Sequence, residues 1–328
     1  MTAREAIKHW NIGKTESIRY VETGIFNETY IAKTDWGTFV LQKLHPLISH
    51  TGPTENYITV AKLLIEKGIP AQIAIPSKHS KLLVADGERS WRLLAAIPGD
   101  VYTVANSIKI VKEAGARLGK FHNALKNFKG KLKKTLPMFQ YNNVLKNLKR
   151  NSRTLLLDAN KEVRNAAQFL LERFPNLFLP KNLPRRLIHT DPKISNFIFD
   201  KSGNATAMID MDTIQCLSPL YDIGDAIRSL CGKEEDDPKN SFNFKKYEAF
   251  LRGYHSTAKK YLSPRERKLI PRATGLVILG LSARFLNDYV DDFYFGWNPK
   301  KYKSRKEHNL ARAFGQIALY KDFLRKIN

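Results

Sequence analysis

The segment His189-Thr190-Asp191-Pro192-Lys193-Ile194-Ser195-Asn196 decides how this chain folds, together with Ile209-Asp210-Met211-Asp212 downstream of it. The first segment has the spacing H-x-D-x-x-x-x-N, and a further carboxylate, Asp210, stands fourteen residues beyond Asn196. Short apolar runs flank these polar residues, and Gly203-Asn204 forms a turn signal between the last two runs. We therefore expect a strand hairpin that brings Asn196 and Asp210 to one edge.

These residue types at this spacing predict phosphoryl transfer from a metal-bound triphosphate to a hydroxyl group. We expect Asp191 to accept or orient the proton of the hydroxyl, and Lys193 to offset charge on the transferring phosphoryl group. Asn196 and Asp210 supply a neutral and a charged oxygen, which are ligands that Mg²⁺ prefers. His189 is expected to brace the loop by hydrogen bonding rather than to do chemistry. ATP and Mg²⁺ are thus the predicted cofactors; in the alternative, these polar residues only cap turns.

Composition sets the class of protein. The chain has 328 residues, 43% of them hydrophobic, which is enough for two lobes with a cleft between them. Two cysteines exclude a disulfide framework, and the absence of an apolar leader or spanning run predicts a cytoplasmic protein. The net charge of +24 can attract nucleic acid or anionic lipid. Because the lysines are dispersed and no nucleic-acid motif is present, we expect no specific nucleic-acid partner and no membrane insertion.

Hydrophobic periodicity predicts a small β-rich lobe followed by a larger helical one. Strands are expected at 17–21, 29–33, 38–44, 81–85 and 90–96, and a helix at 55–67. Beyond a hinge at Pro98-Gly99, helices are expected at 107–125 and 144–174, and from residues 225, 244, 264 and 310 onward. The predicted class is therefore α+β, a protein-kinase-like two-lobed fold with ATP in the cleft. Its nucleotide-binding lobe spans 1–98, and its catalytic and acceptor-binding lobe spans 99–328.

The N-terminal lobe contains candidate contacts for the nucleotide. The loop that holds Gly24, Asn27 and Thr29 lies between two expected strands, where backbone amides can cradle phosphates. At the hinge, the backbone of Ala95 and Ile97 is expected to contact adenine.

A phosphate-binding lysine is expected on the strand at 38–44. Lys43 has the right chemistry, but the alternation of the strand favours Gln42, so both residues remain candidates. Glu55 is a candidate partner for that basic group; alternatively, it complements the dipole of its own helix.

The residues quoted so far resemble the aminoglycoside phosphotransferase and choline kinase superfamily of small-molecule kinases. The resemblance runs over nearly the whole chain, through the Gly24 loop, Trp91–Leu94, Leu118–His122, His189–Asn196, Ile209–Asp212 and Tyr221–Asp225. Within the superfamily, the chain looks most like the N-acetylhexosamine 1-kinases. That narrower likeness lies in Asn27–Tyr30, Leu41–Lys43, Asp210–Thr213, Arg284–Tyr289 with Tyr294-Phe295, and His308–Leu310.

This resemblance implies ATP-dependent phosphorylation of a sugar hydroxyl, in the best case the anomeric one. It implies that Asp212, Arg284 and Tyr294 bind the acceptor and that Asp222 is structural. Alternatively, Arg284 forms a salt bridge with Asp288 one helical turn away, and Tyr294 is a core aromatic.

The chain departs from the pattern of the N-acetylhexosamine 1-kinases in two places. It has one residue fewer between Arg284 and Tyr294, and it has Cys216-Leu217 where a Pro-Gly turn is common. Relatives phosphorylate choline, ethanolamine, homoserine, methylthioribose or aminoglycosides, so kinases of these metabolites are the alternatives, beside a non-catalytic nucleotide-binding relative.

Overall fold

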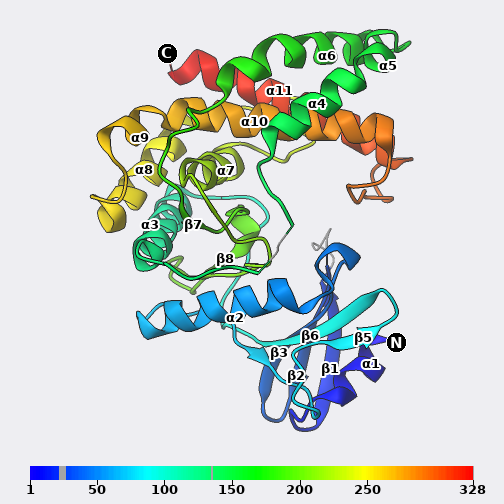
Figure 1. Ribbon diagram of the computed structural model, residues 1–328, viewed down its shortest axis with the longest axis vertical. Helices are drawn as coiled ribbons and strands as arrows, with labels where there is room; N and C mark the ends of the chain where they lie inside the picture. Colours follow the sequence, from blue (N-terminus) through cyan, green and yellow to red (C-terminus); the bar gives the residue numbers. More distant parts are fainter. Residues whose placement is uncertain (22–26, 134–135, 328) are drawn as a thin grey trace.

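The computed structural model describes residues 1–21, 27–133 and 136–327 (Figure 1). An antiparallel sheet forms the N-terminal part, and the C-terminal part is mainly helical, which confirms the expected α+β class. The last strand of the sheet ends at Ala95 and the next helix begins at Ile108. The placement of the lobe boundary between residues 98 and 99 stays a prediction. Within the described ranges, no helix combines the length and the apolar character needed to cross a membrane.

The N-terminal sheet consists of β1 (Thr15–Val21), β2 (Glu28–Thr34), β3 (Gly37–Lys43), β4 (Ala74–Ile75), β5 (Val84–Asp86) and β6 (Arg89–Ala95). The strand order is β1-β2-β3-β6-β4, and β5 also pairs with β6. The register of β3 and β6 places Gln42 opposite Arg92, and Lys43 opposite Trp91. Because opposite residues of antiparallel strands share a face, Gln42 and Arg92 lie on one face of the sheet and Lys43 on the other.

The two faces of this sheet are covered differently. One face carries the core that includes Trp10, Leu41 and Trp91, beneath α1 (Ala3–Ala6) and the short helix η1 (Ile7–His9). The other face packs against α2 (Thr51–Glu66), which begins four residues before the expected start at 55. A short helix η2 (Pro46–Ile48) leads from β3 into α2. Through Arg92 this second face contacts both Tyr57 of α2 and Asp212 of the C-terminal part, and we call it the cleft face.

The C-terminal helices are α3 (Ile108–Leu125), α4 (Tyr141–Arg150), α5 (Ser152–Leu156), α6 (Lys161–Arg173), η3 (Phe174–Leu177), α7 (Leu220–Cys231), α8 (Phe244–Ala258), α9 (Pro264–Lys268), α10 (Ile270–Asp291) and α11 (Arg305–Ile327). The single helix expected at 144–174 was wrong, because three helices occupy that stretch. Asn160 begins α6 by accepting a hydrogen bond from the Glu162 amide at 2.8 Å, which caps a new helix. Helices α7 and α11 begin five residues earlier than expected, at Leu220 and Arg305.

Short strands bring the polar motif into the C-terminal lobe. They are β7 (Arg186–Ile188), β8 (Phe197–Phe199), β9 (Ala205–Met208) and β10 (Gln215–Leu217), with the one-turn helix η4 (Ile194–Asn196) before β8. β8 pairs with β9 as the expected hairpin, and β7 pairs with β10, a strand too short to be recognised from the sequence.

Helices α3 and α8 approach closely enough that a glycine is required. A Cβ atom added at Gly253 would overlap the backbone carbonyl of Lys112. We expect Gly253→Ala to lower the free energy of unfolding by about 1–3 kcal/mol, because backbone cannot yield as a side chain can. Chemical denaturation would measure the change. Ser256→Ala, on the exposed side of the same helix, should stay within about 0.5 kcal/mol of the wild type; a similar loss in both variants would argue against the close contact as the cause.

Candidate active site

The β8–β9 hairpin places Asn196 and Asp210 at neighbouring strand ends. Asn196 immediately precedes β8, and the Ile209 amide, just after β9, donates to the Asn196 carbonyl at 2.9 Å. Asp210 follows with a φ of 66°, in the left-handed region that few non-glycine residues adopt. Backbone strain of this kind persists where the surroundings hold it, often at functional sites.

Asp191 has one carboxylate oxygen occupied and one available. Its Oδ2 accepts hydrogen bonds from Lys193 Nζ at 2.7 Å and from Asn196 Nδ2 at 3.0 Å. Within the described residues, no donor contacts Oδ1, and the side chain is 28% exposed. Burial raises the pKa of Asp191, but the charge and hydrogen bond of Lys193 outweigh it and hold that pKa below its ordinary value. Asp191 therefore presents an ionised, oriented oxygen.

The two residues that would hold a metal ion each present oxygen atoms that can act as ligands. Asn196 Nδ2 donates to both the carbonyl and the carboxylate of Asp191, and its amide oxygen, which can bind a cation, has no hydrogen bond among the described residues. Burial, and then the charge of Asp212, raise the pKa of Asp210, whose carboxylate has no hydrogen bond or ion pair among the described residues. One amide and one carboxylate oxygen fit a hard divalent cation that takes its other ligands from phosphates and water.

A buried carboxylate holds the backbone of the loop His189–Asn196, which we call the catalytic loop after its expected role. Asp222, at the start of α7, accepts the backbone amides of His189 and Thr190, each at 2.7 Å. His122 of α3 lies 3.0 Å from the same carboxylate. Thr190 has a φ of 75°, so these bonds stabilise a conformation that the chain would otherwise avoid. The structural role of Asp222 stays a prediction, which these bonds support.

His189 has both ring nitrogens bonded within the loop. Its Nε2 donates to the Ile209 carbonyl at 2.9 Å, and its Nδ1 accepts the Asp191 amide at 3.3 Å. Because a carbonyl only accepts and an amide only donates, these bonds fix a neutral tautomer. Burial lowers the pKa of His189, which agrees with that state. The geometry is that of a brace between the two halves of the motif.

The expected phosphate loop is only partly described. Gly24 lies outside the described residues. Asn27 is buried and donates to Asp212 Oδ2 at 3.4 Å, and Thr29 Oγ1 accepts from Gln42 at 3.4 Å. These residues thus lie at the end of the sheet that faces Asp212.

At the hinge, two backbone amides are already bonded. Ala95 donates to the Ile73 carbonyl at 2.8 Å, and Ala96 donates to the Thr38 carbonyl at 3.1 Å. Ile97 has no backbone hydrogen bond within the described part of the chain. Of the two residues expected at adenine, Ile97 is the one with an unoccupied amide.

Lys43 and Glu55 are bonded away from the cleft. Lys43 forms an ion pair with Asp86 at 2.9 Å on the opposite face of the sheet, because β-strand alternation turns it away. Glu55 lies 4.0 Å from Lys133 rather than beside a cation of the sheet, since α2 begins early and Glu55 falls in its second turn. Among the described residues, Arg92 of β6 is the cation that lies opposite Gln42 on the cleft face. The signal that could have identified it is a single charged residue within the otherwise apolar run of residues 91–97.

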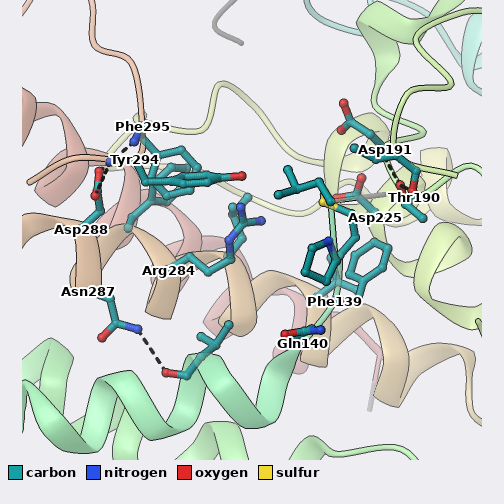
Figure 2. Close-up of a pocket in the computed structure, with 18 of the residues that line it drawn as sticks. Phe139, Gln140, Thr190, Asp191, Asp225, Arg284, Asn287, Asp288, Tyr294 and Phe295 are labelled. Atoms are coloured by element: carbon teal, nitrogen blue, oxygen red, sulfur yellow. Dashed lines mark hydrogen bonds between the residues drawn. The ribbon is translucent and has the colours of Figure 1, made fainter. Parts of the chain in front are cut away.

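A cavity of about 640 Å³ opens beside Asp191, Lys193 and Asp210 (Figure 2). Its far wall comes from α10, α11 and the segment between them, and includes Arg284 and Tyr294. Figure 2 shows Arg284 between the rings of Tyr294 and Phe295 and the side of the cavity that carries Asp191.

The alternative role for Arg284, a salt bridge with Asp288, was wrong. Asp288 instead accepts the backbone amides of Phe293, Tyr294 and Phe295 at 3.1, 2.8 and 2.9 Å. The Arg284 guanidinium lies 5.3 Å from the centre of the Tyr294 ring. Tyr294 is half-buried and lines the cavity, so it is not a core aromatic.

Comparisons with known proteins identify the family of this chain. The model of the phosphotransferase enzyme family matches residues 17–259. A homoserine kinase of Caulobacter vibrioides is 20% identical over 287 residues, which cover 88% of this chain and 85% of that protein. A homoserine kinase of Bartonella tribocorum is 24% identical over 307 residues, 90% of each chain. These relatives do not show the narrower likeness to N-acetylhexosamine 1-kinases.

Solved structures of kinases share the fold. A microcompartment-associated aminopropanol kinase has a TM-score of 0.70 at 16% identity, covering 98% of this chain and 97% of that one. Amicoumacin kinase hAmiN, in complex with AMP-PNP, Ca²⁺ and Ami, has a TM-score of 0.67 at 17% identity, covering 97% and 93%. The two-lobed kinase-like fold is thereby confirmed. Since the family model spans both the sheet and the catalytic loop, this chain belongs to the phosphotransferase enzyme family.

Proposed function

We propose that this chain is an ATP- and Mg²⁺-dependent kinase of a small hydroxyl compound that carries a carboxylate. The observation that carries the kinase assignment is the state of Asp191, which lines the cavity: Lys193 and Asn196 hold its Oδ2, and no donor among the described residues contacts its Oδ1. An oriented carboxylate at the mouth of an acceptor-sized cavity is what hydroxyl activation needs.

In the proposed reaction, Asp191 Oδ1 accepts the proton of the acceptor hydroxyl as its oxygen bonds to the γ-phosphorus. The bond from that phosphorus to the β–γ bridging oxygen breaks, and ADP leaves. Lys193 offsets negative charge on the phosphoryl group during its transfer. Asn196 and Asp210 would hold Mg²⁺, which supplies charge neutralisation to the phosphates when bound.

Relatives support the donor half of this proposal. The amicoumacin kinase structure contains AMP-PNP and Ca²⁺, a nucleotide analogue and a divalent cation. The choice of Mg²⁺ rests on the ligand set: oxygen atoms from one amide and one carboxylate leave several positions for phosphates and water.

The acceptor half rests on two arginines of the cavity wall. Arg284 lies 5.2 Å from the centre of the Phe295 ring, and Arg312 lies 5.3 Å from that of Phe285. The two rings touch, with centres 4.5 Å apart. Arg312 is 4% exposed, and it donates a hydrogen bond to the Gly296 carbonyl at 2.9 Å. Across the described residues, neither guanidinium has a carboxylate within ion-pair distance.

Four other carboxylates that line the cavity, by contrast, are already matched. Asp225 and Glu235 both pair with Arg228, at 2.8 and 2.9 Å, and Asp291 pairs with Arg150 at 2.7 Å. Asp288 is satisfied by backbone amides. Among the described residues that line the cavity, Arg284 and Arg312 are therefore the arginines without a carboxylate partner, and a guanidinium fork recognises carboxylate well. Homoserine kinases, whose named substrate is a hydroxy amino acid, are among the relatives.

A sugar remains the second candidate because of Tyr294. Its half-buried ring lines the cavity beside Arg284, and an aromatic face packs well against a sugar ring. Phosphorylation of an N-acetylhexosamine at its anomeric hydroxyl is the form of this candidate that the family resemblance implies.

A coupled ADP-release assay over homoserine, aminopropanol, N-acetylhexosamines, choline and aminoglycosides separates these candidates. We expect the highest kcat/KM for the carboxylate-bearing hydroxy compound. Turnover of an N-acetylhexosamine alone would reject the carboxylate and keep the kinase. Absence of ADP release with every acceptor would contradict the kinase assignment.

Arg284→Met should raise the KM for the acceptor about tenfold or more, because it removes the charge that binds the acceptor while leaving Asp191 in place. Nucleotide affinity should not change. The matched control is Arg272→Met on the same helix, where the arginine binds backbone carbonyls of residues 176 and 177 outside the cavity. Equal acceptor KM values for Arg284→Met and the wild type would remove Arg284 from the acceptor site.

A further inference from the structure

A buried arginine of the N-terminal sheet reaches the loop that carries Asp210. Arg92 is 1% exposed, and its two terminal nitrogens donate to the two carboxylate oxygens of Asp212, at 2.6 and 2.9 Å. The nitrogen at 2.9 Å also donates to Gln42 Oε1 at 2.6 Å. The guanidinium lies 4.9 Å from the centre of the Tyr57 ring. Strand β3, helix α2 and the loop after β9 therefore meet at one side chain.

Asp212 belongs to the C-terminal lobe but is bonded to the N-terminal one. Besides Arg92, it accepts a hydrogen bond from Asn27, whose own side-chain oxygen accepts the His45 amide at 2.9 Å. Asp212 is 3% exposed and stands two residues beyond Asp210. Because both members of this pair are buried, removing either one leaves an uncompensated charge.

One nitrogen of the guanidinium has no partner among the described residues. Arg92 Nε is buried and has no hydrogen-bond partner in the described part of the chain. A buried donor without a partner is unusual in a native protein and indicates a ligand or a water molecule. Lys43, the other cation considered for this place, is committed to Asp86 on the far face of the sheet.

We propose that Arg92, rather than a lysine of β3, is the cation of the N-terminal sheet that supports binding of the triphosphate. It acts as a positioning residue: its ion pair with Asp212 fixes the loop that presents Asp210, and it joins the two lobes in the arrangement that binds a metal-bound nucleoside triphosphate. This inference rests on the proposed kinase function and adds the residue that couples the sheet to the metal loop.

The test measures binding of AMP-PNP by calorimetry, with and without Mg²⁺ and with no acceptor. We expect Arg92→Gln and Asp212→Asn each to weaken binding in Mg²⁺ about tenfold or more, and the double variant to be no weaker than the worse single one, because the two residues act as a pair. Arg92→Lys, which keeps the charge but not the bidentate geometry, should recover part of the affinity.

Two control variants make the result specific. Lys43→Gln should change the affinity less than twofold. Arg186→Gln removes another bidentate pair, with the buried Glu266, at residues that do not line the cavity. It should lower the melting temperature and leave nucleotide affinity intact, which separates a loss of stability from a loss of positioning.

Opposite outcomes are equally clear. Wild-type affinity in Arg92→Gln, or a larger loss in Lys43→Gln, would overturn the inference. A wild-type protein that binds no nucleotide would overturn the proposed function and this inference together. A wild-type protein that binds nucleotide but phosphorylates no acceptor would reject the kinase function alone. If Arg92→Gln does not fold, Arg92→Lys and Asp212→Asn still decide the question.

Discussion

Replacing Asp191 by Asn should lower kcat by about 10² or more while nucleotide affinity stays nearly unchanged. The amide has the shape of the carboxylate but cannot accept the proton of the acceptor hydroxyl. It also loses the charge that holds Lys193 at 2.7 Å, so the phosphoryl group loses an oriented cation. Steady-state kinetics with the best acceptor, together with nucleotide binding by calorimetry, would measure both effects.

A matched control lies a few residues away. Asp200, in the exposed turn between β8 and β9, bonds to Asn204 and touches no residue of the site. Asp200→Asn should retain wild-type kcat. Turnover near the wild-type rate in Asp191→Asn would show that another group orients the hydroxyl, and the role assigned to this loop would have to be withdrawn.

Replacing Asp210 by Ala should abolish the dependence of nucleotide binding on Mg²⁺. We expect the affinity in Mg²⁺ to fall about 10²-fold, to the level measured in EDTA, because the amide of Asn196 alone cannot hold the cation. Calorimetry in the two conditions gives this comparison. If Asp210→Ala still bound nucleotide more tightly in Mg²⁺ than in EDTA, the metal would have to be held elsewhere.

The loss at Asp210 should not come from unfolding. Burial and the neighbouring Asp212 raise the pKa of Asp210, so the folded protein binds this proton more tightly than the unfolded chain does. The contribution of such a carboxyl to the free energy of unfolding is fully present below its pKa in the unfolded chain, about 4. This contribution is lost as pH rises through the pKa of the carboxyl in the folded protein. The ligand-free Asp210→Asn variant, which lacks this charge, should therefore melt at least as high as the wild type at pH 8, and the difference should shrink at pH 5.

The elements that the sequence predicted are those with strong local patterns. Alternation revealed β1, β2, β3 and β6, and the spacing from His189 to Asp210 located the hairpin that joins Asn196 to Asp210. The helix expected at 144–174 was wrong because its apolar periodicity runs through a break that depends on capping by Asn160. A two-residue strand such as β4 has too little sequence to show a period.

The sequence predicts which site residues lie together when they are close in the chain. Asp191, Lys193 and Asn196 lie within one loop, so their spacing was sufficient to bring the three side chains together. Arg92 acts on Asp212, 120 residues away in sequence, and only the register of β3 and β6 places it on the cleft face. The same register turns Lys43 away from that face. The choice between Gln42 and Lys43 depends on a shift of one residue in strand alternation, which the sequence alone does not fix.

One part of the cavity wall is built from α10, α11 and the segment between them, whereas the loop that carries Asp191 is held by His122 of α3 and Asp222 of α7. Mutations that reshape one wall therefore need not disturb the hydrogen bonds that shape the other. Proteins with this architecture can therefore change their acceptor during evolution while they keep the same phosphoryl-transfer reaction. Laboratory evolution of new acceptors should accordingly succeed by randomising cavity-lining positions after 280, with the hydrogen-bonded residues His122, His189, Thr190 and Asp222 left untouched.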